Sequence, residues 1–497
     1  MDLRKCDFCS KISTPRPQSE LPTTPANLMK KTRIHSPRSK PLFQTSGMTR
    51  RHFIHTGAAA SAALMAGPNI LRAGDGPEPL RVAAIGCGGK GNSDIDEIAR
   101  GNVVRALCDI DDNMAANKRE QYPDARYFHD FREMLDTMGD EIDVVTVSTA
   151  DHSHFPAALA AMRLGKPVFV QKPLTNTIWE ARVLANMAAQ RGIPTVMGNQ
   201  GATFEGTRRI KEILNAGVIG DVVEVHCYTN RPIWPQGRDV ATPGAAVPDH
   251  VKWDLFLAQV ATEWEYSPEI HPFKWRGFWD FGSGAIGDIA CHAMHAGFWA
   301  LDLRGDFTVE AENVSEFDER SFPERSAVIY HFPERNGRPP IKLVWQDGVK
   351  DPNNHPGFIR PAGLPSDYNL RGQDGEQIFI GTEGVLIAPD IYGRAAPILL
   401  PESLEAKASE VPRSIPRVRG GPTQELCAAI RGEGPKPVSN FEDVAAPLTE
   451  MSLAGNLAIH LGQKIDWDSD ALEARNLPEA KSLIKREYRD GWEPDLS

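Results

Sequence analysis

Short apolar runs alternate with helical patterns over residues 80–200. The runs that predict strands are Arg81–Ile85, Val103–Cys108, Val144–Ser148, Val168–Val170 and Thr195–Met197. Helical patterns lie between and after them at Asn92–Ala99, Met114–Gln121, His154–Leu164 and Ile178–Gln190. The last pattern opens with the capping-box signature Thr177-x-x-Glu180 and ends at Gly192. This alternation predicts a doubly wound parallel sheet with crossover helices, which we assign to residues 80–204.

The pattern changes near Asp221 to longer strands. Val222–Thr229, Ala327–Phe332, Ile341–Trp345 and Glu376–Ala388 predict an open, mainly antiparallel sheet. A helix at Gly206–Asn215 precedes these strands, and helices at Pro422–Ala429 and Asp443–Leu461 follow them. A Trp-rich insertion occupies about residues 230–305. The fold class is therefore α/β, with a second α/β domain over residues 205–490.

The first strand breaks directly into the glycine motif Gly86-Cys87-Gly88-Gly89-Lys90-Gly91. In such a G-x-G-x-x-G turn, the first glycine permits the tight turn, the second lets the backbone approach a pyrophosphate, and the third lets the helix pack on the strand. The helix N-terminus then offers unpaired N–H groups to phosphates. An ordinary Gly-rich loop is the alternative, but the strand, the glycines and the second strand together indicate a dinucleotide-binding Rossmann domain.

The second strand ends in Asp109. An acid about 20 residues after the glycines can accept hydrogen bonds from both ribose hydroxyls, whereas it would repel a 2′-phosphate. No arginine follows it at once, so we predict NAD rather than NADP. The predicted cofactor-binding residues are Gly86, Gly88, Gly89, Gly91, Asp109, Thr149, His152, Lys172 and Asn199.

Composition excludes some partner classes. The net charge of −11 supplies no broad positive field, so nucleic acid is not an expected partner.

Seven scattered cysteines are too few for a disulfide scaffold, and five of them are expected to be small buried side chains. Cys6 and Cys9 form a C-x-x-C pair without a second pair nearby. We predict no metal site, because the folded region offers neither H-x-x-x-H nor C-x-x-C spacing.

The N-terminus resembles an export signal. Residues 1–47 have the composition of a disordered leader, and residues 48–75 place Arg50-Arg51 before an Ala-rich apolar stretch. That stretch is too short for a stable membrane span. A chance arginine pair in an amphipathic leader is the alternative. We predict a twin-arginine-type signal, periplasmic location, and an NAD that is loaded before export, tightly bound and recycled.

A lysine and an Asp/His pair could carry chemistry. Lys172 follows the strand Val168–Val170, where a doubly wound sheet faces its ligand crevice, and can stabilise alkoxide charge. Asp288 and His292 are four residues apart, so on a helix they would share one face, and Asp288 could orient the imidazole. A surface lysine and a local salt bridge are the alternatives. Thr149, His152 and Asn199 follow strand ends beside the expected nicotinamide.

These motifs and the domain order resemble the glucose–fructose oxidoreductase / inositol dehydrogenase / rhizopine-catabolism (Gfo/Idh/MocA) family over about residues 80–490. The resemblance implies that Lys172, Asp288 and His292 are catalytic, and that the open sheet forms a homo-oligomer contact. One departure is Gln171, where the family usually has glutamate before Lys-Pro. We expect this change to lower the proton affinity of the lysine.

The predicted function is an exported NAD(P)-dependent dehydrogenase that acts on a sugar or polyol hydroxyl, with His292 as base and Lys172 on the oxygen. An NAD-dependent glycoside lyase or hydrolase, working through a transient keto-sugar, is the alternative. A non-catalytic sugar sensor is a third reading, against which the intact Lys172, Asp288 and His292 argue. The tryptophans of the insertion suit a carbohydrate, although core packing explains any single one equally well.

Overall fold

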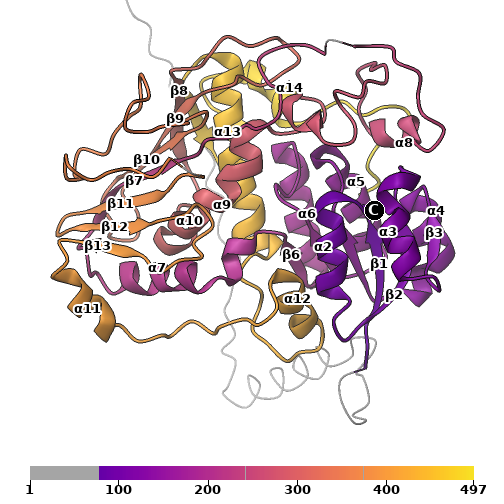
Figure 1. The fold of residues 1–497 in the computed structure, drawn as a ribbon, viewed down its shortest axis with the longest axis horizontal. Helices are drawn as coiled ribbons and strands as arrows, with labels where there is room; N and C mark the ends of the chain where they lie inside the picture. Colours follow the sequence, from indigo (N-terminus) through magenta and orange to yellow (C-terminus); the bar gives the residue numbers. More distant parts are fainter. Residues whose placement is uncertain (1–77, 241, 373, 497) are drawn as a thin grey trace, which may run out of the picture. The chain divides into compact units, whose positions relative to one another are not determined.

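The computed structural model describes residues 78–240, 242–372 and 374–496, and it contains two sheets (Figure 1). The predicted leader, the predicted signal and the pair Cys6 and Cys9 lie outside the described residues. The first sheet is parallel throughout, in the order β3-β2-β1-β4-β5-β6. Its strands are β1 (Arg81–Ile85), β2 (Val103–Cys108), β3 (Arg126–Phe128), β4 (Val144–Val147), β5 (Val168–Val170) and β6 (Thr195–Met197).

This strand order creates a ligand crevice. Successive strands run outward from β1 in one direction through β2 and β3, and in the other through β4 to β6, so loops diverge beyond the carboxyl ends of β1 and β4. The helices of this domain are α2 (Gly89–Ile98), α3 (Asp112–Gln121), α4 (Phe131–Met138), α5 (His154–Arg163) and α6 (Ile178–Arg191). The predicted doubly wound sheet is confirmed, and the pattern missed only the short β3 and α4.

The second sheet has the order β13-β12-β11-β7-β10-β9-β8-β14-β15 and is antiparallel except where β7 and β10 pair in parallel. Its strands are β7 (Val222–Tyr228), β8 (Phe307–Glu312), β9 (Ala327–Phe332), β10 (Ile341–Gln346), β11 (Gln377–Gly381), β12 (Val385–Ala388), β13 (Ile398–Leu400), β14 (Ile465–Asp468) and β15 (Glu473–Ala474). The predicted mainly antiparallel sheet is confirmed. The single long strand predicted over Glu376–Ala388 is wrong, because the chain turns between Gly381 and Gly384.

Helix α13 joins the two sheets into one core. The remaining helices are α7 (Glu205–Asn215), α8 (Trp253–Leu257), α9 (Cys291–Ala293), α10 (His295–Leu301), α11 (Leu404–Glu410), α12 (Pro422–Ile430), α13 (Ala446–Leu461) and α14 (Lys481–Ile484). Figure 1 shows α13 between α6 and the strands β8 and β9, and nearly every side chain of α13 is buried. Residues of both domains therefore belong to one hydrophobic cluster.

The capping box predicted at the start of α6 does not form. Thr177 has a backbone suited to an N-cap, but its hydroxyl accepts no capping hydrogen bond. The Glu180 side chain instead accepts a hydrogen bond from the Tyr488 hydroxyl at 3.0 Å. Glu180 thus has a tertiary partner from the C-terminal segment on one oxygen, and its other oxygen has no hydrogen bond. The predicted helix end is confirmed, since Gly192 has the left-handed conformation.

The chain itself covers part of the outer face of the second sheet. Tyr228, Ile378 and Ile387 on the strands pack with Leu364 and Leu370 from the loop after β10. The proline-rich loop after β10 thus covers part of this face of the sheet. Assembly of a homo-oligomer through the rest of this sheet stays a prediction. Among the described residues, none of the helices combines the length and the apolar character needed to cross a bilayer.

Candidate functional site

The glycine turn leaves no room for a side chain at three of its positions, and at one of them, Gly88, a Cβ would overlap the side chain of Met114. Gly86 has a φ of 86°, and a Cβ there would overlap the carbonyl of Ser148 on the neighbouring strand end. A Cβ on Gly91 would overlap the carbonyl oxygen of Gly86. Gly89 (φ 51°) has open space around it. The first and third glycines of the motif therefore allow close packing of strand and helix, as the sequence predicts.

Replacing Gly91 by alanine should destabilise the protein. The new methyl group meets backbone, which cannot move aside as a side chain could, and such overpacking costs about 1–3 kcal/mol of unfolding free energy. Gly434→Ala is the matched control, because a Cβ there is exposed and meets only the methyl group of Ala428 at 3.4 Å. Denaturant unfolding of the two variants measures the difference. Equal midpoints would contradict the packing role of Gly91.

Asp109 is held at the end of β2 by backbone donors. Its carboxylate accepts hydrogen bonds from the N–H of Cys87 at 2.7 Å and from the N–H of Asp111 at 3.0 Å. Burial raises its pKa, although the two N–H groups oppose the rise. The hydrogen bond from Cys87 ties the acid to the glycine turn itself. The carboxylate is thus fixed beside the turn, where a ribose would lie.

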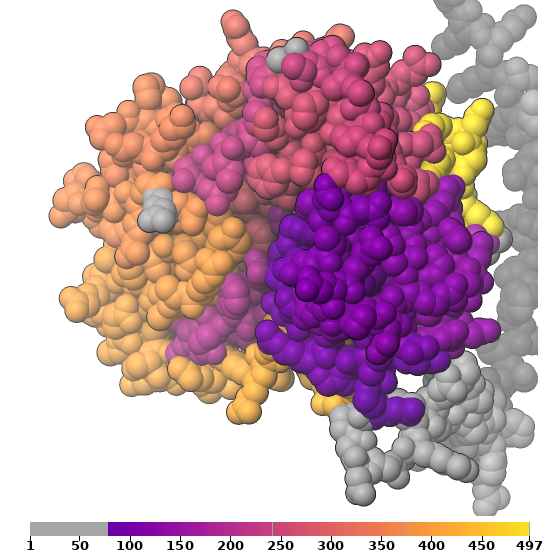
Figure 2. Space-filling view, turned by 45° about the vertical axis from the view of Figure 1, so that its right-hand side comes forward, coloured from indigo at the N-terminus to yellow at the C-terminus, as the bar shows by residue number. Residues whose placement is uncertain are grey.

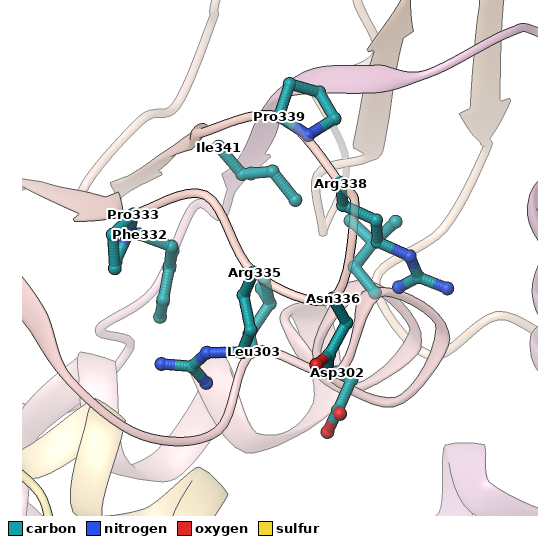
Figure 3. Close-up of a pocket in the computed structure, with 10 residues that line it drawn as sticks. Asp302, Leu303, Phe332, Pro333, Arg335, Asn336, Arg338, Pro339 and Ile341 are labelled. Carbon is teal, nitrogen blue, oxygen red and sulfur yellow. The ribbon is translucent and has the colours of Figure 1, made fainter.

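One cavity of about 450 Å³ collects most of the predicted site residues. It runs from the glycine turn to the segment that contains the Asp/His pair. Of the predicted residues, those that line it are Gly86, Gly88, Gly89, Asp109, Thr149, Lys172, Asp288 and His292. A smaller cavity of about 160 Å³ lies at the β9–β10 turn, where Figure 3 shows Arg335, Asn336 and Arg338. None of the predicted site residues lines that smaller cavity.

Lys172 is paired with Asp288. Its Nζ donates to the Asp288 carboxylate at 2.7 Å and to the backbone carbonyl of Asp288 at 2.9 Å. Because an ammonium has three N–H donors, one remains for a ligand. Arg276 lies 3.4 Å from the same carboxylate. Burial alone would raise the pKa of Asp288, but the two cations more than offset it, so that this pKa falls to about 2.

Asn199, and not Asp288, holds the imidazole of His292. Residues Ile286–Ala290 form a π-helical turn, so the α-helical i, i+4 argument does not apply, and Asp288 turns to Lys172. The Asn199 amide donates to the carbonyl of Cys291 at 2.7 Å, which leaves its oxygen 3.2 Å from Nδ1 of His292. Nδ1 must then carry the proton and Nε2 the lone pair. Burial and the charge of Lys172 lower the pKa of His292, so the ring is neutral.

His152 lies in the core and not at the cavity. It is fully buried, and its Nδ1 and Nε2 lie 3.2 and 2.7 Å from the backbone carbonyls of Phe281 and Phe256. Burial lowers its pKa to about 3. The prediction that His152 contacts the cofactor is therefore corrected: its ring joins the insertion to the first domain. Asn199 is likewise corrected from a cofactor contact to a residue behind His292.

Asp151 is a cavity residue that the sequence analysis did not select. It follows β4, is 2% exposed, and accepts a hydrogen bond from the Ser283 hydroxyl at 2.5 Å. Burial raises its pKa to about 7, with the charge of Asp288 adding to the rise. Its place in the loop after β4, at the carboxyl edge of the parallel sheet, was the available signal. The cavity thus holds a buried carboxyl group whose pKa is raised towards neutral pH.

Gln171 belongs to a polar network behind the glycine turn. Its amide donates to the buried carboxylate of Asp94 at 2.8 Å, and the Ser148 hydroxyl donates to the same oxygen at 2.8 Å. Lys90 forms an ion pair with the other oxygen of Asp94. A glutamate at position 171 would place a second carboxylate there. The neutral amide of Gln171 therefore donates to Asp94 where a glutamate would repel it. Lys172 pairs with the carboxylate of Asp288.

The Trp-rich insertion covers the cavity at the Asp109 end. Its backbone pairs with the segment after β2 through an isolated bridge between Asp111 and Val251, and His271 Nε2 lies 2.8 Å from the Asp111 carboxylate. Figure 2 shows this rose-coloured segment against the indigo first domain. Trp234 and Trp275 line the cavity, whereas Trp253 and Trp264 pack among phenylalanines. Among the described residues, no group of three or more His, Cys, Asp or Glu side chains could hold a metal ion.

The sequence is similar to those of known oxidoreductases. Residues 80–199 match the model of an oxidoreductase family with an NAD-binding Rossmann fold. Inositol 2-dehydrogenase 2 of Saccharopolyspora erythraea is 26% identical over 251 residues, which are 48% of this chain and 73% of that protein. Inositol 2-dehydrogenase of Burkholderia multivorans is 31% identical over 153 residues, 30% of this chain and 45% of that protein. The chain thus spans less than half of the second relative.

Solved structures share the fold. The WlbA dehydrogenase of Chromobacterium violaceum, solved with NADH and UDP-GlcNAcA, covers 80% of this chain and 99% of its own at a TM-score of 0.55 and 14% identity. That likeness concerns the fold alone. The family match shows that residues 80–199 are the NAD-binding Rossmann domain of the Gfo/Idh/MocA oxidoreductase family.

Proposed function

We propose that the protein is a dehydrogenase that oxidises a secondary hydroxyl of a sugar or polyol with NAD. The observation that carries this proposal is a single cavity that joins the glycine turn and Asp109 to Lys172, Asp288, His292 and Asp151. A nucleotide-binding end and an acid–base end in one space are what hydride transfer from a CH–OH group requires.

The residues around the turn fit a dinucleotide. Gly88 and Gly89 line the cavity at the N-terminus of α2, where the backbone N–H groups and helix dipole favour a pyrophosphate. The fixed carboxylate of Asp109 would accept hydrogen bonds from the ribose, and Thr149 lies farther along the cavity. Bound NAD would accept a hydride from the substrate carbon.

Two side chains of the protein act on the substrate hydroxyl: one accepts its proton and the other stabilises its oxygen. Nε2 of His292 carries a lone pair because Asn199 fixes the proton on Nδ1, so it can accept the hydroxyl proton. The third N–H of Lys172 donates to the same oxygen and stabilises its developing charge. Asp288 holds the lysine in place. Asn199 and Asp288 are thus positioning residues, one for each catalytic side chain.

Asp151 favours a second candidate function, glycoside cleavage by elimination. Oxidation of a ring hydroxyl to a ketone acidifies the adjacent C–H bond. A base then removes that proton, the electron pair forms a C=C bond, and the glycosidic oxygen leaves with a proton. Water would add to the C=C bond and the hydride would return to the ketone, so that no net reduction remains. This step needs a base besides His292. Asp151 lines the same cavity, and one of its oxygens has no hydrogen-bond partner among the described residues.

The substrate class rests on the relatives and on the cavity wall. The inositol dehydrogenases act on a cyclic polyol, and WlbA was solved with a sugar nucleotide. Trp234, Trp275 and Arg231 line the cavity of this chain, which offers flat apolar faces and a guanidinium to hydroxyls. We infer a carbohydrate or polyol ligand.

We also propose that NAD is tightly held, recycled in place and carried out of the cytoplasm with the folded protein. The insertion supports this by covering the Asp109 end of the cavity. The Arg50-Arg51 pair supports export. Cell fractionation of the native chain and of a variant with Arg50→Lys and Arg51→Lys tests it, since equal periplasmic amounts would contradict the signal.

The function is tested on protein purified without added cofactor. Denaturation should release NAD, measured by absorbance. The loaded protein is then given D-glucose, myo-inositol and 4-nitrophenyl glycosides. Reduced nicotinamide with a keto product supports the dehydrogenase, and 4-nitrophenol without net reduction supports the second candidate. If neither NAD nor any turnover is found, with NAD added or not, both candidates fail.

A further inference from the structure

Two polar side chains in the cavity around Lys172 and His292 have no hydrogen-bond partner. Several other polar side chains that line this cavity are already bonded within the protein: Ser148, Thr149, Ser153 and Gln171. Among the described residues, the phenol hydroxyl of Tyr392 and the side-chain amide of Gln200 have no such bond. Both residues are half-buried, and their polar atoms are not enclosed by protein. These two groups are therefore available to a ligand.

Tyr392 reaches the cavity from the second domain. It lies in the loop between β12 and β13, and its ring centroid is 4.8 Å from that of His292. The Arg394 guanidinium lies 4.2 Å from the same centroid, so two side chains hold the ring. Because Nε2 of His292 is the proposed acceptor of the substrate proton, the phenol lies next to the place of the reacting hydroxyl.

The loop that carries Tyr392 is fixed by its own hydrogen bonds. The Asp390 carboxylate accepts hydrogen bonds from the N–H of Tyr392 at 2.9 Å and from the N–H of Arg394 at 3.1 Å. The N–H of Thr207 on α7 donates to the carbonyl of Gly393 at 3.0 Å. A side chain on a loop held in this way loses little conformational freedom when it binds a ligand.

Gln200 approaches the same place from the first domain. It directly follows Asn199, the residue that orients His292, and begins the turn Gln200–Thr203. The next residue, Gly201, packs against the loop of Tyr392, since a Cβ there would come within 2.8 Å of the Tyr392 carbonyl oxygen. The amide and the phenol therefore belong to adjacent segments beside one imidazole.

The chemistry of this pair fits neutral hydroxyl groups. A phenol and a primary amide can each donate and accept a hydrogen bond, as a hydroxyl can, and neither carries a charge. The nearby cations Lys172 and Arg276 already share the carboxylate of Asp288. An anionic group on the ligand would therefore find no unshared positive charge among these residues.

We propose that Tyr392 and Gln200 bind the hydroxyl groups next to the carbon that is oxidised, and so select the sugar or polyol and the position that reacts. This inference rests on the proposed function, because His292 defines the reacting hydroxyl. Both residues would contact the substrate without moving its proton. Their loss should therefore act on substrate binding more than on kcat.

Tyr392→Phe tests the phenol, because it removes the hydroxyl and keeps the ring beside His292. Tyr266→Phe is the matched control: Tyr266 is also half-buried, its hydroxyl has no partner among the described residues, its ring contacts Trp253, and it does not line the cavity. D-Glucose and myo-inositol are titrated calorimetrically into the full chain loaded with NADH, which cannot accept a hydride. Tyr392→Phe should bind the better probe about tenfold more weakly than the native protein and Tyr266→Phe do.

The monodeoxy analogues of the better probe identify the hydroxyl that is bound. The analogue that lacks the partner of Tyr392 should bind the native protein and Tyr392→Phe within about twofold of each other, whereas the remaining analogues keep the difference of about tenfold. Gln200→Met should give the same pattern for a second position. A general disturbance of the cavity would weaken the binding of every analogue alike.

The proposal is overturned if Tyr392→Phe titrates like Tyr266→Phe, if the loss is equal for every analogue, or if neither probe binds. Formation of reduced nicotinamide by the NAD-loaded chain is measured alongside. Turnover with unchanged binding in Tyr392→Phe removes this inference and leaves the proposed function. Binding that depends on the Tyr392 hydroxyl without any reduction of NAD removes the proposed dehydrogenase and keeps Tyr392 as a ligand-binding residue.

Discussion

Lys172→Met is expected to lower kcat by about 100- to 1000-fold, the usual effect of removing one donor aimed at a developing oxyanion. Methionine keeps the length of the side chain and removes the N–H groups that reach Asp288 and the substrate oxygen. The effect should fall on kcat more than on KM, because the charge on the oxygen grows only towards the transition state. Steady-state kinetics with the best compound of the panel measures it.

Lys407→Met is the control for this prediction. Lys407 lies on α11, where it and its partner Glu383 are both 60% exposed, so its loss should change kcat less than twofold. The NAD content of Lys172→Met is measured alongside, because an empty protein would mimic a catalytic defect. If the NAD-loaded Lys172→Met turns over within tenfold of the native rate, Lys172 does not act on the substrate oxygen.

Asp151→Asn is expected to slow glycoside cleavage by about 100- to 10,000-fold, the usual contribution of a general base. The asparagine still accepts the Ser283 hydroxyl but cannot take a proton from carbon. The first reduction of bound NAD, which uses His292, should change less than tenfold. Rapid mixing with a 4-nitrophenyl glycoside separates reduced nicotinamide from 4-nitrophenol. Equal losses in both signals would contradict the assignment of Asp151 to the second proton.

The same residue fixes the expected pH dependence. Burial, and then the charge of Asp288, raises the pKa of Asp151 to about 7, so the carboxyl is protonated below that pH and inactive as a base. Glycoside cleavage should therefore rise with pH through a midpoint near 7. Asp347→Asn is the matched control: Asp347 is buried in the second domain, accepts a hydrogen bond from the Ser326 hydroxyl at 3.0 Å, and has a pKa raised by burial to about 6. A midpoint that moves in Asp347→Asn would show that the profile reports stability.

The features predicted correctly from the sequence are those set by neighbours in the chain. The strand Arg81–Ile85 and the glycines after it follow from an apolar run and from a turn that must pass close to backbone. The place of Lys172 follows from topology, because the carboxyl ends of parallel strands face one crevice. The capping box did not form: the Thr177 hydroxyl has no partner, and Glu180 accepts a hydrogen bond from Tyr488, far along the chain.

The roles of three residues at the site could be assigned only from the tertiary structure. His152 and Asp151 are adjacent after the same strand, yet the histidine ring points into the core formed with the insertion and the carboxylate lines the cavity. Asn199 and not Asp288 sets the tautomer of His292, because a π-helical turn redirects Asp288 to Lys172. Nothing in the spacing of these residues indicates such pairings.

The sequence by itself determined the fold class, the glycine turn and the position of Lys172 after a parallel strand. Each of these depends on local backbone geometry or on strand direction. The tertiary structure alone decided which acid meets which base and that the insertion covers the Asp109 end. Those contacts join segments more than 90 residues apart, such as Asn199 with His292 and Asp151 with Ser283. The charge state of a buried group depends on such distant neighbours, which periodicity along the chain does not encode.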